Sequence, residues 1–244
     1  MSTTEEIREY WDADAATYDD SPSHRPTSAG ETAAWIAALS RLLPPAPARV
    51  LDCGAGTGFL SLTAARLGHR VTALDLSNGM LAKLRQRAAI EGLSIEIVQG
   101  SATEPPSGPF DAVMERHVLW TLPDPVAALG AWRNAAPFGR LVVLESVWGD
   151  VDRAEVLRGK ARHALRRLRR TPDDHHGEYR PELRGALPLG TGTPPSQVIE
   201  MVIDAGWRTP RLERLRDIEW ATAVDLPLPE RLLGVPPRFA VLAT

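Results

Sequence analysis

Short apolar runs alternate with amphipathic segments along the first 147 residues of the chain. The runs are bounded by proline or glycine and have the length of buried strands, whereas the segments between them repeat apolar residues at the spacing of a helix. Strands are predicted at residues 49–53, 70–75, 95–99, 110–114 and 140–147, and helices near residues 2–10, 29–43, 59–67, 77–91 and 125–136. Strands that alternate with helices predict parallel βαβ units in a doubly wound α/β sheet.

The pattern changes after residue 147. The remaining elements are predicted as a basic helix at 152–170, a loop rich in proline, glycine, histidine and aspartate at 171–194, a helix at 195–205, and strands at 211–220 and 239–243. The region before the last helix interrupts the alternation and leaves the carboxyl edge of the sheet, where ligands bind in open α/β folds. We therefore interpret residues 150–194 as a lid.

Composition and charge exclude several classes of protein. The chain of 244 residues is 43% hydrophobic and 24% charged, which is ordinary for a globular protein and excludes disordered and fibrous chains. The net charge of −3 excludes a basic nucleic-acid coat, and the single cysteine, Cys53, excludes an internal disulfide and a cysteine-based zinc site. No apolar run approaches the roughly 20 residues that cross a bilayer, and the acidic N-terminus is unlike a secretory leader. We expect a soluble, cytoplasmic protein without a membrane partner.

A glycine-rich loop follows the first predicted strand and opens the next helix. Gly54, Gly56 and Gly58 let the backbone approach a ligand closely, and the helix N-terminus beyond them offers free N–H groups to an anion. A dinucleotide fingerprint would place its third glycine one position later, where Phe59 stands, so the spacing disfavours a pyrophosphate ligand. Asp75 ends the following strand, where a carboxylate can accept both hydroxyl groups of a ribose.

Four motifs follow one another along the first half of the chain. They are V-L-D-C-G-A-G-T-G-F-L-S at 50–61, A-L-D-L-S at 73–77, G-S-A at 100–102 and F-D-A-V-M-E-R-H-V-L-W-T-L-P-D-P at 110–125. In this order they resemble the motifs of the class I S-adenosylmethionine-dependent methyltransferases. The segment Y-W-D-A-D-A-A-T-Y-D at 10–19 is similar to the leader of the ubiquinone/menaquinone-methyltransferase-like branch.

The resemblance implies a Rossmann-like sheet of seven mostly parallel strands, with the last strand antiparallel, helices on both faces, a helical leader and a lid insertion. We expect a single methyltransferase domain over 1–244, made of a helical leader or cap at 1–47, a cofactor-binding core at 48–149, the lid insertion at 150–194, and a C-terminal helix with strands at 195–244. S-adenosylmethionine would be the methyl donor and S-adenosylhomocysteine the product, with a small-molecule acceptor and no metal.

The resemblance also implies which residues bind the cofactor. These are Tyr18 over the methionine end, Asp52 to orient the loop, Gly54, Ala55 and Gly56 along the methionine portion, Asp75 on the ribose, Leu76 and Met80 beside the adenine, Ser101 and Ala102 along its edge, and Arg116 near the sulfonium. Family members usually carry aspartate where Ser101 stands, so this chain lacks the usual acceptor for the adenine amino group.

Candidate acceptor-side residues lie in the leader, after the fourth strand and in the lid. His117 titrates near neutral pH and is the candidate general base, the alternative being a hydrogen bond to loop backbone. Trp120 is the first candidate for an aromatic wall, and His24 and Tyr179 are candidates for acceptor contacts, the alternative being ordinary core and loop positions. The seven tryptophans and His117 favour a nitrogen-containing aromatic acceptor, such as an indole-type compound in specialised metabolism, and leave transfer to oxygen, nitrogen or carbon open.

Other polar clusters leave alternatives open. His175 and His176 adjoin two aspartates, but neighbouring residues cannot all face one ion, so a solvated loop is favoured over a metal site. The basic helix could bind RNA, yet its apolar stripe favours a packed helix with a solvated outer face. The fourth strand is not followed by an N-P-P-Y-like turn, which families that methylate the amino groups of nucleic-acid bases usually have. The alternatives are thus an RNA methyltransferase using residues 153–170, a non-catalytic cofactor-binding protein and, more remotely, a nicotinamide-dependent dehydrogenase. The oligomeric state is open, with a homodimer as one alternative.

Overall fold

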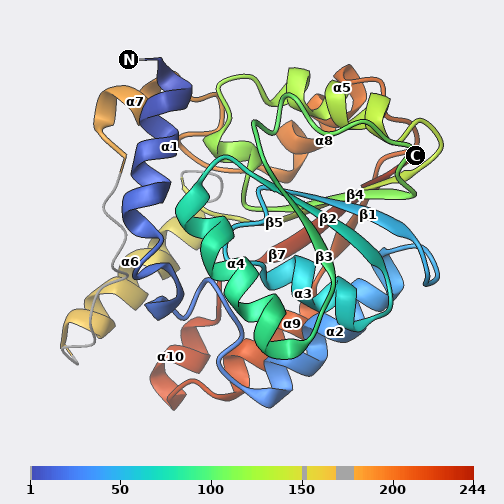
Figure 1. Ribbon diagram of the computed structural model, residues 1–244. Coiled ribbons are helices and arrows are strands. Elements are labelled where there is room, and N and C mark those ends of the chain that lie inside the picture. Colours follow the sequence, from blue (N-terminus) through green and yellow to red (C-terminus); the bar gives the residue numbers. More distant parts are fainter. Residues whose placement is uncertain (1, 150–152, 169–178) are drawn as a thin grey trace.

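The computed structural model describes residues 2–149, 153–168 and 179–244, and its strands form one sheet in the order β3-β2-β1-β4-β5-β7-β6 (Figure 1). The strands are β1 (Arg49–Cys53), β2 (Arg70–Asp75), β3 (Ile95–Gln99), β4 (Ala112–Arg116), β5 (Arg140–Ser146), β6 (Arg211–Arg214) and β7 (Arg238–Ala243). Strand β7 runs antiparallel to β5 and β6, and the other neighbouring strands pair in parallel. The predicted seven-stranded, mostly parallel sheet with an antiparallel last strand is confirmed.

Helices cover both faces of this sheet. They are α1 (Thr3–Asp14), α2 (Ala29–Leu42), α3 (Phe59–Arg66), α4 (Asn78–Glu91), α5 (Pro125–Ala135), α6 (Arg153–Leu168), α7 (Pro181–Ala186), α8 (Pro195–Asp204), α9 (Arg216–Val224) and α10 (Leu228–Leu233). Trp132 of α5 and Val202 of α8 pack in one core with alternate strand residues. Leu39 of α2 and Ile218 of α9 pack in a second core on the opposite face. The central strands β1, β2, β4 and β5 are mostly apolar and buried along most of their length, because helices cover both of their faces.

The segment predicted as a strand at 211–220 is wrong over its second half. Strand β6 ends at Arg214, and the chain continues as helix α9. Ile218 and Ala221 are buried three residues apart, which is the spacing of one helix face, and α9 packs against α2. Glu219 accepts a hydrogen bond from the backbone N–H of Arg238 at 2.7 Å and so ties α9 to β7. Tertiary packing decided the state of this short segment, whose apolar residues fit either pattern.

Three other differences from the predicted elements remain. Residues 181–186, predicted within a loop, form helix α7, and residues 228–233 form helix α10, which was not predicted. Both helices are six residues long and begin next to a proline, so their apolar periodicity is too short to be recognised. Strand β4 begins at Ala112, two residues after its predicted start.

The leader lies across the carboxyl edge of the sheet, beside α4 (Figure 1). Asp12 of α1 accepts hydrogen bonds from the Ser77 hydroxyl at 2.6 Å and from the Gly79 backbone N–H at 3.0 Å. Farther along, Asp19 pairs with Arg87 of α4 at 2.5 Å. These contacts hold the leader against the ends of β1 and β2, where the glycine loop begins.

Candidate functional site

The glycine loop after β1 forms a backbone cradle. Gly54, Gly56 and Gly58 all have positive φ, at 68°, 55° and 93°, a left-handed conformation that glycine adopts without steric cost. A Cβ atom at Gly54 would lie 2.1 Å from a methyl group of Val118, so that glycine is required by packing. At Gly56 nothing lies within 4 Å of the equivalent position, and the backbone there borders a cavity. A side chain at Gly56 would therefore fill space that a ligand can occupy.

Asp75 holds this cradle in shape. Its two carboxylate oxygens accept hydrogen bonds from the backbone N–H groups of Gly56 at 2.7 Å and Ser77 at 2.8 Å. Burial raises the pKa of Asp75 to about 6, so the carboxylate is mostly ionised at neutral pH. A carboxylate has about four acceptor sites, and the two not used by backbone leave room for two ribose hydroxyl groups.

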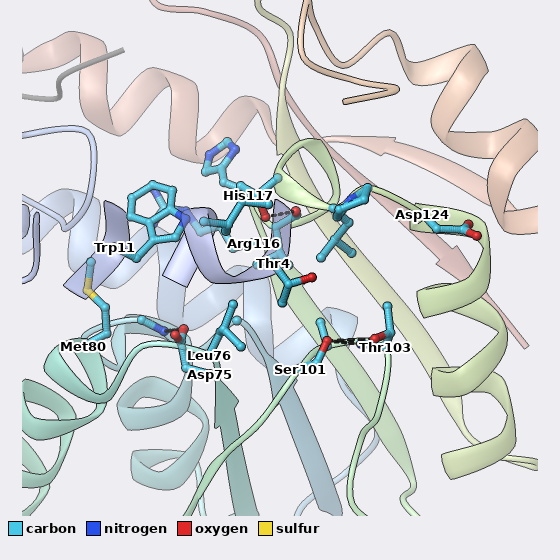
Figure 2. Close-up of a pocket in the computed structure, with 18 of the residues that line it drawn as sticks. Thr4, Trp11, Asp75, Leu76, Met80, Ser101, Thr103, Arg116, His117 and Asp124 are labelled. Atoms are coloured by element: carbon cyan, nitrogen blue, oxygen red, sulfur yellow. Dashed lines mark hydrogen bonds between the residues drawn. The ribbon is translucent and has the colours of Figure 1, made fainter. Parts of the chain in front are cut away.

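One cavity at the carboxyl ends of the strands gathers most of the residues that the sequence singled out (Figure 2). From the predicted cofactor set it is lined by Tyr18, Gly54, Gly56, Asp75, Leu76, Met80, Ser101, Ala102 and Arg116. Asp52 and Ala55 border an adjoining recess instead, together with His24. Asp52 is buried and accepts a hydrogen bond from Ser61 of α3 at 2.5 Å, which ties the end of β1 to the helix after the loop.

The end of the cavity expected to face adenine carries hydroxyl groups. The hydroxyls of Ser101 and Thr103 lie 2.7 Å apart, and both residues line the cavity (Figure 2). Thr121 also lines it, although its hydroxyl is engaged with the carbonyl of Val118 at 2.7 Å. The hydroxyls of Ser101 and Thr103 offer both donors and acceptors at this edge, in place of a carboxylate.

His117 stands at the end of β4 in a strained conformation. Its φ is 59°, which is uncommon for a residue with a side chain. Nδ1 of the ring lies 2.9 Å from an oxygen of Glu145, and Nε2 lies 3.4 Å from the hydroxyl of Ser146. Burial, together with the nearby charges of Arg116 and Arg238, lowers the pKa of His117 well below its ordinary value. Figure 2 shows the imidazole on the Trp11 side of the cavity, away from Asp75.

Sequence reasoning missed Glu145. It lies near the end of β5, a strand that is buried continuously from its second to its sixth residue and so gave no reason to expect a functional carboxylate. Its side chain has no exposure to solvent, and burial raises its pKa to about 8. Only the pairing of β4 with β5 brings it beside the imidazole.

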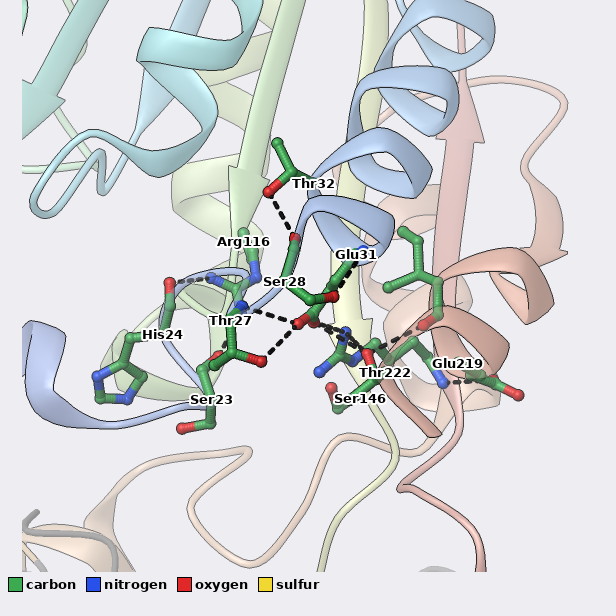
Figure 3. Close-up of polar contacts among 12 residues, drawn as sticks. Ser23, His24, Thr27, Ser28, Glu31, Thr32, Arg116, Ser146, Glu219 and Thr222 are labelled. Atoms are coloured by element: carbon green, nitrogen blue, oxygen red, sulfur yellow. Dashed lines mark hydrogen bonds and ion pairs between the residues drawn. The ribbon is translucent and has the colours of Figure 1, made fainter. Parts of the chain in front are cut away.

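Arg116 connects the leader to the end of β4 by hydrogen bonds. Its guanidinium donates to the backbone carbonyls of Ser23 at 2.7 Å and His24 at 3.1 Å (Figure 3). It also lies 5.2 Å from the ring centre of Trp35 and 5.1 Å from that of Phe59. Burial lowers the pKa of Arg116 to about 10, which still leaves it charged at neutral pH. The residue borders the cavity, but its terminal nitrogens are used to hold the leader loop.

Aromatic side chains cluster beside the cavity. The ring of Trp120 lies 5.2 Å from Tyr179, 6.4 Å from Trp11 and 5.6 Å from Trp148. Trp11 lines the cavity directly, whereas Trp120 and Tyr179 lie behind it in a cluster with Ile7. Burial raises the pKa of Tyr179 far above its ordinary value. Trp120, the first candidate for an aromatic wall, therefore does not line the cavity itself, and Trp11 does.

Tyr18 and His24 form a second aromatic contact. Their rings are stacked with centres 3.8 Å apart, and both border the recess next to the glycine loop. Burial raises the pKa of Tyr18 to about 12, so its hydroxyl stays protonated. This pair covers the loop that is expected to hold the methionine portion of the cofactor.

The remaining predicted clusters give no second site within the described residues. Where the structure describes side chains, it holds no group of three or more His, Cys, Asp or Glu that could bind a metal ion, and His175 and His176 lie outside that part. The basic helix α6 uses Arg162 for packing, since this residue pairs with Glu155 and donates to carbonyls at the end of α10. None of the described helices combines the length and apolar character needed to cross a bilayer.

Comparisons with known proteins agree with this geometry. Residues 50–136 match the family described as a methyltransferase domain. Over 108 residues the chain is 39% identical to the ubiquinone biosynthesis O-methyltransferase of Xanthomonas axonopodis pv. citri (strain 306), a match that covers 42% of this chain and 45% of that protein. Residues 50–136 are a class I S-adenosylmethionine-dependent methyltransferase domain. The family predicted from the motifs is thereby confirmed.

A second relative matches a longer stretch of the chain. The chain is 37% identical over 144 residues to the protein of the same name from Xanthomonas campestris pv. campestris (strain B100), which covers 57% of this chain and 56% of that protein. The chain therefore matches these curated relatives over about half of their length. The range matched by the family model, 50–136, contains strands β1 to β4.

Solved structures resemble this chain in fold. Haemonchus contortus phosphoethanolamine N-methyltransferase 2, in complex with phosphomonomethylethanolamine and S-adenosylhomocysteine, has a TM-score of 0.62 at 16% identity and covers 100% of this chain and 60% of that chain. A structure described as the conversion of a disulfide bond into a thioacetal group during echinomycin biosynthesis has a TM-score of 0.60 at 23% identity. It covers 97% of this chain and 92% of that chain. At these identities the likeness establishes the fold alone.

Proposed function

We propose that this chain transfers a methyl group from S-adenosylmethionine to a small-molecule acceptor. The observation that carries the proposal is the cradle in which Asp75 holds the backbone of Gly56 at the mouth of the cavity. Asp75 would take the ribose, the backbone of Gly54 and Gly56 would approach the methionine portion, and Leu76 would lie against the adenine.

The bound donor would supply an electrophilic methyl group on a positively charged sulfur. The chain's own contribution is then mainly to orient the two reactants and exclude water, and such positioning can supply on the order of 7–11 kcal/mol of the barrier. The leader supports this role, because Asp12, Asp19 and Arg116 fasten it over the carboxyl edge of the sheet. We infer that the leader and the described parts of the insertion, 153–168 and 179–194, close the site; residues 150–152 and 169–178 of the predicted lid lie outside the described residues.

The acceptor is inferred to be aromatic. Trp11 on the cavity wall, backed by Trp120 and Tyr179, offers flat apolar surfaces on which a ring can stack. A nitrogen-containing aromatic compound in specialised metabolism, such as an indole-type molecule, fits this wall. The names of the curated relatives favour transfer to oxygen.

An RNA methyltransferase is the second candidate, supported by the exposed cations Arg158, Lys160 and Arg167 on α6. It is disfavoured because Arg158 and Arg162 are paired with Glu155 and because the whole chain is net acidic. A protein that binds the cofactor without transferring methyl is the third.

Incubation with methyl-labelled S-adenosylmethionine and an extract of the host cell tests these proposals. Label in the small-molecule fraction is the expected result, and mass spectrometry would then identify the acceptor. Label in RNA would overturn the proposal in favour of the second candidate. Cofactor binding without transfer to any fraction would favour the third, and absence of S-adenosylhomocysteine binding would contradict all three.

A further inference from the structure

We propose that Glu145 and His117 work as one acid–base pair, in which Glu145 orients the imidazole and His117 takes the proton from a hydroxyl group of the acceptor. The inference rests on the proposed function and narrows its substrate class to small molecules with a weakly acidic hydroxyl, such as phenols. His117 would be the catalytic residue and Glu145 a positioning residue.

The pair is built into the ends of two neighbouring strands. Arg116, the last residue of β4, lies opposite Leu144 of β5, and His117 follows with a φ of 59°. Its backbone N–H still donates to the carbonyl of Leu144 at 3.2 Å. Nδ1 of its ring lies 2.9 Å from Oε2 of Glu145. The left-handed backbone costs free energy in a residue with a side chain, and such strain is commonly kept where it positions a functional group.

Burial sets this carboxylate apart from a surface ion pair. The side chain of Glu145 is 0% exposed, whereas that of His117 is 30% exposed. The second oxygen of Glu145, Oε1, is buried without a hydrogen-bond partner among the described residues. Buried polar atoms are nearly always hydrogen-bonded, so this half-satisfied carboxyl group is unusual, and its position beside the imidazole lets it hold the ring in place and exchange a proton with Nδ1.

The surrounding charges determine when the pair can accept a proton. Burial raises the pKa of Glu145 to about 8, and burial with Arg116 and Arg238 lowers that of His117. Glu115, on the strand beside Glu145, is also buried, and its pKa is raised well above its ordinary value. The Glu145 carboxyl therefore keeps its proton at neutral pH and releases it near pH 8. Above that pH, Glu145 is ionised, and Nδ1 of His117 carries the ring proton and donates it to Oε2 of Glu145. Nε2, which lies 3.4 Å from the Ser146 hydroxyl, keeps the lone pair that can accept a proton.

Methyl transfer and proton transfer take place together when Glu145 is ionised. Nε2 of His117 accepts the hydroxyl proton, the acceptor oxygen forms a bond to the methyl carbon, and the carbon–sulfur bond breaks with its electron pair passing to sulfur. The products are a methyl ether, the neutral thioether S-adenosylhomocysteine and an imidazolium ion held by Glu145. Release of that proton to solvent through the exposed part of the ring restores the starting form.

Nuclear magnetic resonance of the free, ¹⁵N-histidine-labelled protein tests the pair without an acceptor. The signals of His117 are assigned with a His117→Gln variant and followed across neutral and alkaline pH in the parent and in Glu145→Gln. In the parent we expect the ring ¹⁵N signals of His117 to show a titration step near pH 8, above which Nδ1 is protonated and Nε2 is not. In Glu145→Gln this step should disappear. An identical titration of His117 in both proteins would overturn the proposal.

Glu155→Gln is the matched control. It neutralises another buried glutamate, paired with Arg162 on α6 rather than with a histidine, and should leave the His117 titration unchanged. Calorimetric titration of S-adenosylhomocysteine into the same proteins tests cofactor binding separately from the Glu145–His117 pair. If the parent protein does not bind S-adenosylhomocysteine, the proposed function is contradicted. Parent-like binding by Glu145→Gln shows that this variant is folded. If Glu145→Gln does not fold, Glu145→Asp serves instead and should move the step, and an unmoved step would overturn the pair.

Kinetics on the acceptor found in the extract complete the test. His117→Gln should lower kcat by about 10²–10⁴-fold, the usual contribution of general base catalysis. Glu145→Gln should lower kcat less, leave KM near the parent value and abolish the rise of kcat with pH near 8. Transfer of label only to carbon or to an amine nitrogen would overturn the assigned substrate class.

Discussion

Single side chains at the carboxyl edge of the sheet carry most of the expected chemistry. Asp75 accepts two backbone N–H groups and keeps acceptor capacity for a ligand, whereas Asp52, buried beneath the loop, contacts the Ser61 hydroxyl. The two carboxyl groups therefore differ in role although both lie at a strand end. Asp75 faces the cavity and Asp52 supports the loop from behind.

Replacing Asp75 by Asn should weaken S-adenosylhomocysteine binding by about 10–150-fold, because hydrogen bonds to a charged group are worth roughly 1.5–3 kcal/mol. Affinity of the parent should also fall as pH drops through about 6, where Asp75 becomes protonated. Isothermal titration calorimetry at several pH values measures both effects. Asp204→Asn on the exposed side of α8 is the control, and an unchanged Asp75→Asn affinity would remove Asp75 from the site.

Asp52→Asn should change the pH dependence of stability. Burial raises the pKa of Asp52 from 3.8 to about 7, so between these values the folded protein holds a proton that the unfolded chain has released. The stability linked to that proton is complete below 3.8 and is lost as pH rises through about 7. Because asparagine cannot ionise, the free energy of unfolding of the variant relative to the parent should improve as pH rises. Urea denaturation measures this difference, and a value independent of pH would contradict the argument.

At the scale of elements, the strand–loop–helix unit of β1 and α3 separates packing from ligand binding. Its three glycines share a left-handed backbone, but their surroundings differ. Gly54 is held against Val118 and Gly58 against Leu84, whereas Gly56 faces open space in the cavity. One loop thus contains two glycines that packing requires and one whose Cβ position opens into the cavity.

Gly56→Ala should cost about 1–2 kcal/mol of stability, the usual strain of a left-handed residue with a side chain, and should abolish S-adenosylhomocysteine binding. Gly92→Ala is a matched control, because Gly92 has a φ of 65°, also has nothing within 4 Å of its Cβ position, and ends α4 outside the cavity. Thermal unfolding measures the stability of the two variants, and calorimetric titration measures their binding of S-adenosylhomocysteine. Equal loss of stability with loss of binding only in Gly56→Ala is expected, and retained binding in both would contradict a ligand at the cradle.

At the scale of the whole molecule, the leader is joined to distant parts of the chain. Asp12 binds the start of α4, Asp19 pairs with Arg87, and Arg116 at the end of β4 holds two leader carbonyls. Glu31 at the start of α2 continues this network by pairing with Arg238 of β7 at 3.3 Å (Figure 3). The cavity is therefore enclosed by segments that are far apart in sequence.

Gly79→Ala should loosen the leader. A Cβ atom there would lie 2.9 Å from that of Ala15 at the end of α1, so the two helices must separate. Limited proteolysis should cleave the leader faster than in the parent, and S-adenosylhomocysteine should bind more weakly. Gly130→Ala, a helical glycine of α5 with nothing within 4 Å, should instead stabilise the protein by about 0.5–1 kcal/mol and leave cleavage unchanged. Parent-like cleavage of Gly79→Ala would show that this contact does not hold the leader.

The sequence by itself determined the alternating strands and helices, the parallel order of the core and the glycine loop followed by Asp75. These features depend on local periodicity and on the backbone freedom of glycine, both of which can be read along the chain. The tertiary structure alone decided that 216–224 is a helix, that Arg116 binds the leader, and that Glu145 lies beside His117. Each of these depends on contacts between strands, or between sheet and leader, that residue spacing does not encode. The acceptor side of the site is made of such contacts, so its chemistry emerged only from the folded arrangement.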